Sequence, residues 1–200
     1  MTRQLTHQKR NVERAQPTPG ETLAQRLRTS LASRSYGGGR GLTPTSALLL
    51  DTSSSMSSHI GANQTKISEL RKLANGFTDV RRFHFGSAVE ELKPSDAVPE
   101  PAGGTNLALA FTEVKKAGVT HVVLITDGQP DDARSALYEA RGLRVDVFYV
   151  GPDPQPPFLA DLARVTGGSY GKATLTALKE LTAAVKQRLC IEAPKGAIQL

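Results

Sequence analysis

Oxygen-bearing side chains are concentrated in three separate segments of the sequence. The first, DTSSS at residues 51–55, directly follows the apolar run LLL. The second, GGTN at residues 103–106, opens a helical pattern, and the third, TDG at residues 126–128, closes the run HVVLIT. Open α/β sheets bind ligands at the edge where the carboxyl ends of their strands meet. The three segments therefore predict one binding site built from hydroxyl and carboxylate oxygens.

The order of these residues carries more information than any one motif. An Asp-x-Ser-x-Ser motif, a later Thr in a Gly-Gly-Thr turn and a later Thr-Asp-Gly after an apolar strand resemble the metal-ion-dependent adhesion site (MIDAS) of von Willebrand factor type A (VWA) domains. Asp-x-Ser-x-Ser alone is a weak signal, because Ser-rich loops are common. The complete set is specific, and the resemblance implies a small VWA domain of the prokaryotic, intracellular type. Its members here are Asp51, Ser53, Ser55, Thr105 and Asp127.

The resemblance implies that the cation is Mg²⁺, with Mn²⁺ or Ca²⁺ as substitutes. It also implies that Ser53, Ser55 and Thr105 bind the ion directly, while Asp51 and Asp127 hold its coordinated waters. Mg²⁺ is a hard cation that takes oxygen ligands in octahedral geometry and keeps several waters. An ion bound mainly by neutral oxygens keeps positive charge, so an Asp or Glu of a protein partner can complete its shell.

Glycines and further polar residues near these segments are expected to shape the loops and to stabilise the ends of helices. Gly103, Gly104 and Gly128 lack a Cβ, so their loops can take positive φ and approach the ion. Asp131 and Asp132 are predicted in the first turn of a helix, where carboxylates favour the positive dipole end. Each ligand candidate also has a structural alternative, as a cap of a helix or turn. The histidines at positions 59, 84 and 121 are expected in exposed or packing roles.

These residues favour a metal-dependent adhesion or scaffold module, without enzymatic activity. Small intracellular VWA proteins of this kind commonly work with AAA+ ATPases or in stress-response complexes, so the resemblance implies a partner from such an assembly. The alternative is a Mg²⁺-dependent phosphatase or phosphotransfer-like enzyme in which Asp51 is the nucleophile. Against it, Ser53 stands where such phosphatases need a second Asp.

The net charge of +6 lies entirely in the first 44 residues, which hold eight basic and two acidic side chains. Residues 45–200 are formally neutral, so nucleic acid is an alternative partner only through this basic arm. Leu23, Leu27 and Leu31 predict a short amphipathic helix over residues 21–33 of the arm, before a Gly-rich linker. The single Cys190 and the lack of a long apolar run favour the cytoplasm without a membrane anchor.

Elements that would position the site follow from residue 45 onward, where short β-rich runs alternate with helical patterns. This alternation predicts a doubly wound, Rossmann-like α/β fold with a mostly parallel sheet, helices on both faces and one antiparallel edge strand. The predicted domain covers residues 45–190, between the arm (1–44) and a tail (191–200). Strands are expected at 46–51, 80–85, 88–92, 121–126, 144–150 and 169–172, and helices at 66–77, 106–117, 131–141, 157–166 and 174–189.

Overall fold

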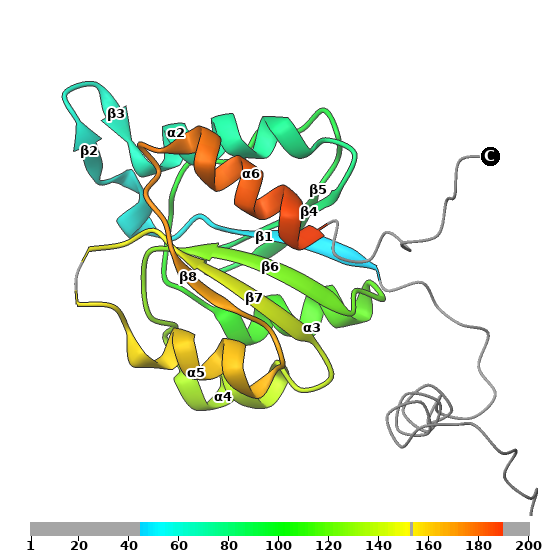
Figure 1. Ribbon diagram of the computed structural model, residues 1–200. Helices are drawn as coiled ribbons and strands as arrows, with labels where there is room; N and C mark the ends of the chain where they lie inside the picture. The colour runs from blue at the N-terminus through cyan, green and yellow to red at the C-terminus, as the bar shows by residue number, and fades with distance from the viewer. Residues whose placement is uncertain (1–44, 153, 190–200) are drawn as a thin grey trace, which may run out of the picture. The chain divides into compact units, whose positions relative to one another are not determined.

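The computed structural model describes residues 45–152 and 154–189, and its centre is a six-stranded sheet in the order β5-β4-β1-β6-β7-β8 (Figure 1). All neighbouring strands run parallel except β4 and β5, which form an antiparallel hairpin at one edge. The predicted α/β class, including the antiparallel edge strand, is therefore confirmed. The strands are β1 (Ser46–Asp51), β4 (Arg81–Phe85), β5 (Val89–Leu92), β6 (His121–Thr126), β7 (Arg144–Tyr149) and β8 (Tyr170–Lys172).

The central strands β1 and β6 begin and end where the sequence predicts. Both carry apolar residues without alternation, as expected of parallel strands covered on both faces. Every residue of β6 is buried, and so is every residue of β1 after Ser46. The two strands lie side by side in parallel register, with Leu50 opposite Ile125. Their carboxyl ends, Asp51 and Thr126, consequently emerge at the same edge of the sheet.

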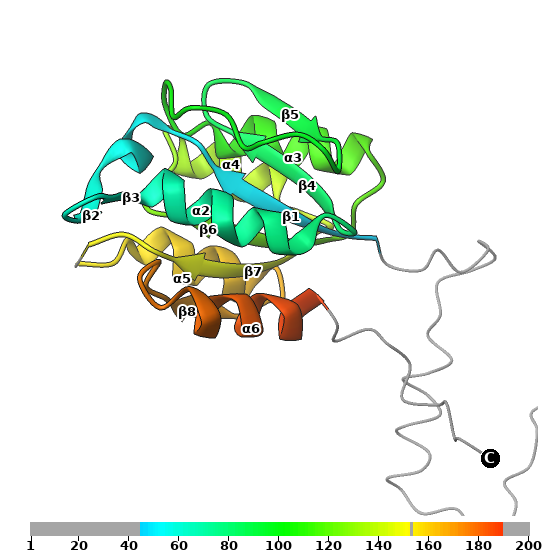
Figure 2. The same cartoon turned by 90° about the horizontal axis from the view of Figure 1, so that it is seen from above.

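Helices cover both faces of the sheet: α2 and α6 lie on one face and α3, α4 and α5 on the other (Figures 1 and 2). Several begin later or end earlier than predicted. The predicted helix 66–77 ends as α2 at Ala74 and continues as the 3-10 turn η2 (Asn75–Phe77). The helices are α2 (Lys66–Ala74), α3 (Leu107–Lys116), α4 (Ala133–Glu139), α5 (Pro157–Val165) and α6 (Leu178–Leu189).

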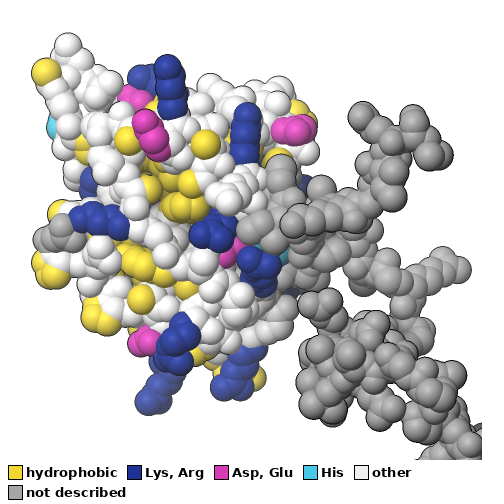
Figure 3. Space-filling view, in the orientation of Figure 1, with side chains coloured by type: hydrophobic (Ala, Val, Ile, Leu, Met, Phe, Trp, Pro, Cys, Tyr) yellow, Lys and Arg dark blue, Asp and Glu magenta, His cyan; other side chains and the backbone are white. Residues whose placement is uncertain are grey.

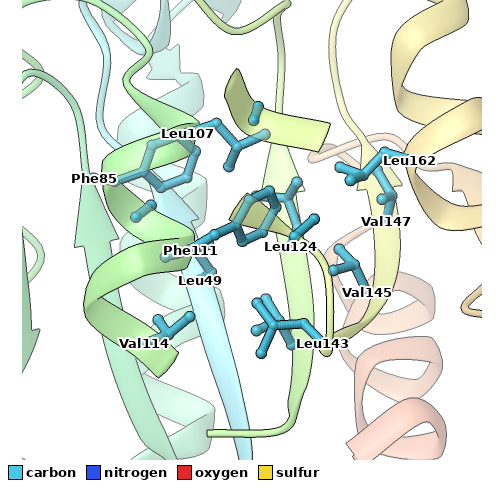
Figure 4. Close-up of a cluster of buried hydrophobic side chains, with 14 of the residues drawn as sticks. Leu49, Phe85, Leu107, Phe111, Val114, Leu124, Leu143, Val145, Val147 and Leu162 are labelled. Atoms are coloured by element: carbon cyan, nitrogen blue, oxygen red, sulfur yellow. The ribbon is translucent and has the colours of Figure 1, made fainter. Parts of the chain in front are cut away.

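Two apolar cores hold these layers together, one on each side of the sheet. Phe85, Phe111 and Leu124 are fully buried in the core between the sheet and α3, α4 and α5 (Figure 4). The opposite core contains Leu50 and Ile125 and is closed by α2 and α6. Fully burying one such side chain contributes roughly 1.5–3 kcal/mol to stability. Successive side chains of β1 point to opposite faces of the sheet and pack into both cores. This packing holds the strand rigidly in place.

A small hairpin between β1 and α2 was not predicted. After the 3-10 turn η1 (Ser54–Ser57), β2 (His59–Gly61) pairs antiparallel with β3 (Gln64–Thr65). Thr65 then caps α2 in a reciprocal exchange with Ser68, which fixes the start of the helix. His59 is exposed, as predicted, although it lies in a strand rather than in a loop.

Both ends of this domain lie at the edge of the sheet opposite the carboxyl ends of the parallel strands (Figure 1). The basic arm, its predicted helix over residues 21–33 and the predicted tail lie outside the described residues. Within the described part of the chain, no helix is long and apolar enough to cross a membrane. On the face seen in Figure 3, Lys and Arg side chains are spread among apolar and neutral ones.

Candidate metal centre

Backbone hydrogen bonds hold the three predicted segments at one edge of the sheet. The Ala102 N–H donates to the Thr52 carbonyl at 2.9 Å, and the Ser54 N–H donates to the Gly103 carbonyl at 3.1 Å. The GGTN segment is thereby fastened to the DTSSS loop that follows β1. The third segment reaches the same edge directly, because β6 is the parallel neighbour of β1.

Asp51 is fully buried at the end of β1, and each of its carboxylate oxygens accepts a hydrogen bond. Oδ1 accepts the Ser53 backbone N–H at 2.8 Å, and Oδ2 accepts the Thr126 hydroxyl at 2.5 Å. Burial raises the pKa of Asp51, the bonds from Ser53 and Thr126 oppose this rise, and the nearby Asp127 adds to it. A cation at this position would favour the ionised form of the carboxyl group.

Hydroxyl groups link the DTSSS loop to the end of β6. Ser53 Oγ lies 3.1 Å from Ser55 Oγ, and the Ser55 hydroxyl donates to Asp127 Oδ1 at 2.7 Å. With Asp51, four of the predicted ligands therefore form a compact set of oxygen atoms. Hard cations such as Mg²⁺ prefer such ligands, so the residues present fit the predicted ion.

The fifth candidate, Thr105, is held through its backbone. Its N–H donates to both carboxylate oxygens of Asp131 at 3.0 Å, and the Asp131 N–H donates back to the Thr105 carbonyl at 3.1 Å. The prediction that Asp131 lies in the first helical turn is therefore wrong, since α4 begins at Ala133. Asp132 is the N-cap of α4 and accepts the backbone N–H groups of the second and third helical residues.

A lysine that the sequence did not single out belongs to the same constellation. Lys66 Nζ donates to Asp127 Oδ2 at 2.5 Å, and the side chains of Lys66 and Asp127 are only 11% and 1% exposed. The two residues are 61 positions apart in the sequence, so no local motif predicts their contact. The helical spacing nevertheless indicates that Lys66 is buried, because it lies four residues before Leu70 and therefore on the same inward face of α2.

The three glycines predicted to shape the loops differ in their roles. Gly103 has a φ of 73°, which side chains rarely tolerate. Gly104 has no positive φ, but a Cβ there would lie 2.5 Å from Asp131 Oδ2. The prediction for Gly128 is wrong, because its φ is not positive and a Cβ there would meet no atom within 4 Å.

A hollow of about 340 Å³ adjoins the DTSSS and GGTN loops. Thr52 and Gly103 contribute to its wall from the two loops, and His84 and Glu100 add polar groups. His84 Nδ1 lies 3.3 Å from the Thr52 hydroxyl. Burial lowers the pKa of His84, and the charge of Glu90 opposes this. The hollow is lined by residues of the two loops, but none of the five predicted ligands contributes to its wall.

The layered, mostly parallel sheet with helices on both faces places this domain in the doubly wound α/β class. Residues 78–171 match the model of the von Willebrand factor type A domain family. The matched range includes Thr105 and Asp127 and begins after the DTSSS loop. This part of the chain is therefore similar to VWA domains.

Solved structures of VWA type share this fold. Proximal thread matrix protein 1 from the mussel byssus is 16% identical over 74% of this chain and 48% of its own, with a TM-score of 0.58. A von Willebrand factor type A protein from Catenulispora acidiphila is 16% identical over 71% of this chain and 41% of its own, with a TM-score of 0.56.

A second structure of the mussel protein is described as having a zinc occupied MIDAS motif, and it aligns with a TM-score of 0.53 at 16% identity, over 74% of this chain and 47% of its own. This chain thus spans less than half the length of these structures. Comparison with curated proteins gave no match.

Proposed function

We propose that this domain binds a divalent cation, Mg²⁺ in the first place, at the carboxyl edge of its sheet and uses the ion to bind a protein partner. The ligands in this proposal are Asp51, Ser53, Ser55, Thr105 and Asp127. The observation that carries it is the continuous chain of oxygen contacts from Ser53 through Ser55 to Asp127. The zinc in the MIDAS motif of the mussel protein supports the choice of a divalent ion.

The partner in this proposal supplies an Asp or Glu carboxylate to the cation. Two carboxylates of the site face one internal ammonium, so a divalent ion remains under-neutralised and attracts a further anion. The hollow beside the site would receive a neighbouring side chain of the same partner. The partner's origin, an intracellular complex of the AAA+ ATPase or stress-response kind, is proposed on the resemblance alone.

Binding rather than catalysis is proposed, and the setting of Asp51 supports this choice. A nucleophilic carboxylate needs an oxygen that can reach the substrate. Asp51 is completely buried, and both of its oxygens already accept hydrogen bonds from the protein. A phosphatase assay in Mg²⁺ checks this choice, because turnover that disappears in Asp51→Asn would contradict it.

Thermal unfolding in EDTA and in Mn²⁺ or Mg²⁺ tests the metal site. A ligand that binds only the folded state at about 100 times its Kd adds about 2.7 kcal/mol, which is about 5–10 °C in Tm for a domain of this size. Wild type should show this increase, and Asp51→Ala and Ser55→Ala should lose it. Ser57→Ala is the matched control, because Ser57 lies in the same turn but is exposed and bonds only the Ser54 carbonyl.

An equal increase in all four proteins, or none in wild type, would overturn the metal site. The partner is tested separately, by capture from cell extract in Mg²⁺ and in EDTA with wild type and Ser55→Ala. A partner of the proposed kind is released by EDTA and is not retained by Ser55→Ala.

A further inference from the structure

Lys66 places a positive charge inside the candidate metal centre. Its ammonium contacts Asp127 Oδ2, while the Ser55 hydroxyl occupies Oδ1 of the same carboxylate. Burying an ammonium is costly unless it is paired. The other lysine of α2, Lys72, pairs with Glu69 and keeps 56% of its side chain exposed. Lys66 is therefore a specific component of the site rather than part of a solvated helix surface.

Charge within the site follows directly from this contact. Asp51 and Asp127 bring two negative charges, and Lys66 cancels one of them. A divalent ion bound there would leave a net charge of about +1 instead of neutrality, and like charges at short range repel even in a medium as polar as water. The ammonium thus opposes the free cation and favours the addition of one more anion.

We infer that Lys66 is an internal counter-cation that weakens the binding of free divalent metal and couples metal binding to the arrival of a carboxylate ligand. This inference rests on the proposed function, because it concerns the same metal centre. In the absence of a partner the site binds its ion weakly. An incoming carboxylate compensates the excess positive charge, so metal and partner bind more tightly together than separately.

A purely positioning role for Lys66 predicts the opposite result. If its hydrogen bond served only to aim Asp127 at the ion, its removal would weaken metal binding. An internal counter-cation predicts that removal strengthens it. The sign of the change in metal affinity therefore separates the two roles without any measurement of activity.

The experiment is calorimetric titration of Mn²⁺ alone, and then in a saturating concentration of acetate as a simple carboxylate, into the full chain. Lys66→Met removes the charge and keeps an apolar stem, and Lys66→Gln removes the charge but keeps a hydrogen-bond donor. Both should bind Mn²⁺ about tenfold or more tightly than wild type. Acetate should improve binding to wild type by a larger factor than to either variant. Lys72→Met, which removes an exposed charge from the same helix, should match wild type.

Each outcome has a distinct meaning. If no protein binds Mn²⁺, the proposed function fails together with the inference. If all bind with equal affinity, or the Lys66 variants bind more weakly, the inference fails and the metal site stands. Should both variants be unfolded without metal, folding upon addition of Mn²⁺ at concentrations that leave wild type unsaturated supports the inference, and persistent unfolding overturns it.

Discussion

Thr105 and Asp131 are joined by reciprocal hydrogen bonds, with the Thr105 N–H on the Asp131 carboxylate and the Asp131 N–H on the Thr105 carbonyl. These bonds connect the loop before α3 to the loop after β6. The Ser54 to Gly103 backbone bond connects the former loop to the one after β1. All three segments of the candidate site are therefore tied to one another, and a change in one should alter the position of the others.

Asp131→Ala removes the carboxylate that holds the Thr105 backbone. We expect Mn²⁺ affinity to fall by about tenfold, because a ligand that is no longer fixed by outer hydrogen bonds binds its metal 10- to 100-fold less well. Calorimetric titration measures this. Asp132→Ala is the control, since it removes the cap of α4 but should leave metal affinity unchanged. Equal losses of affinity in both variants would mean that the hydrogen bonds between Asp131 and Thr105 do not determine metal affinity.

Gly104→Ala tests the same contact from the other side. The added Cβ would lie 2.5 Å from Asp131 Oδ2, so the carboxylate must swing away from the Thr105 N–H. We expect weaker Mn²⁺ binding with little change in Tm, because the displaced group is the end of an exposed side chain. Gly76→Ala serves for comparison, since a Cβ there meets nothing within 4 Å. Unchanged metal affinity in Gly104→Ala would show that the loop absorbs the methyl group.

Thr126→Val keeps the shape of the side chain but removes the hydroxyl that donates to Asp51. Its removal leaves a buried acceptor without a partner, which costs about 1–3 kcal/mol, so the free energy of unfolding should fall by about that amount. Urea denaturation without metal measures the loss. Thr126→Ser retains the donor and should lose less. If Ser and Val prove equally destabilising, the hydrogen bond to Asp51 is not the main contribution of Thr126 to stability.

Asp146 gives the domain a defined response to acid. Burial raises its pKa, but bonds from the Ser169 hydroxyl, His121 and the Ser169 backbone N–H, with the charge of Arg144, outweigh burial and hold the pKa below its usual value. The ionised form therefore stabilises the fold fully above about pH 4 and ceases to do so as pH falls through the lowered pKa.

Urea denaturation of wild type and Asp146→Asn as a function of pH measures this contribution. The stability difference between the two proteins should be constant from about pH 5 to neutrality and should shrink steadily below about pH 4. A difference that persists unchanged into strong acid would mean that Asp146 stabilises the fold by hydrogen bonding rather than by its charge.

Sequence patterns were sufficient where local composition decides structure. The unbroken apolar runs of β1 and β6 leave few alternatives to buried parallel strands, so their limits were predicted correctly. Their order in the chain then places Asp51 and Asp127 at the same edge. The start of α4 was predicted two residues early, because Asp132 caps the helix instead of joining it and Asp131 turns toward Thr105.

Contacts between distant segments could not be predicted from the sequence. The pairing of Lys66 with Asp127 depends on the β2–β3 hairpin, which returns the chain to the site, and on the capping exchange that begins α2 at Lys66. The hairpin has no strong composition signal, whereas the start of the helix at Lys66 was predicted correctly. Gly128 was predicted to need glycine because it follows Asp127. The prediction is wrong, because the loop has room for a side chain at this position.

The two edges of the sheet restrict how another protein can approach this domain. At one edge, β5 is a four-residue strand with Glu90 and Glu91 exposed, and Arg81 holds Glu91. At the other, β8 has only three residues. Short, charged outer strands discourage the lateral addition of a foreign strand. The addition of a partner's strand is thus disfavoured at both edges of the sheet, whereas the loops that follow β1 and β6 are not subject to this restriction.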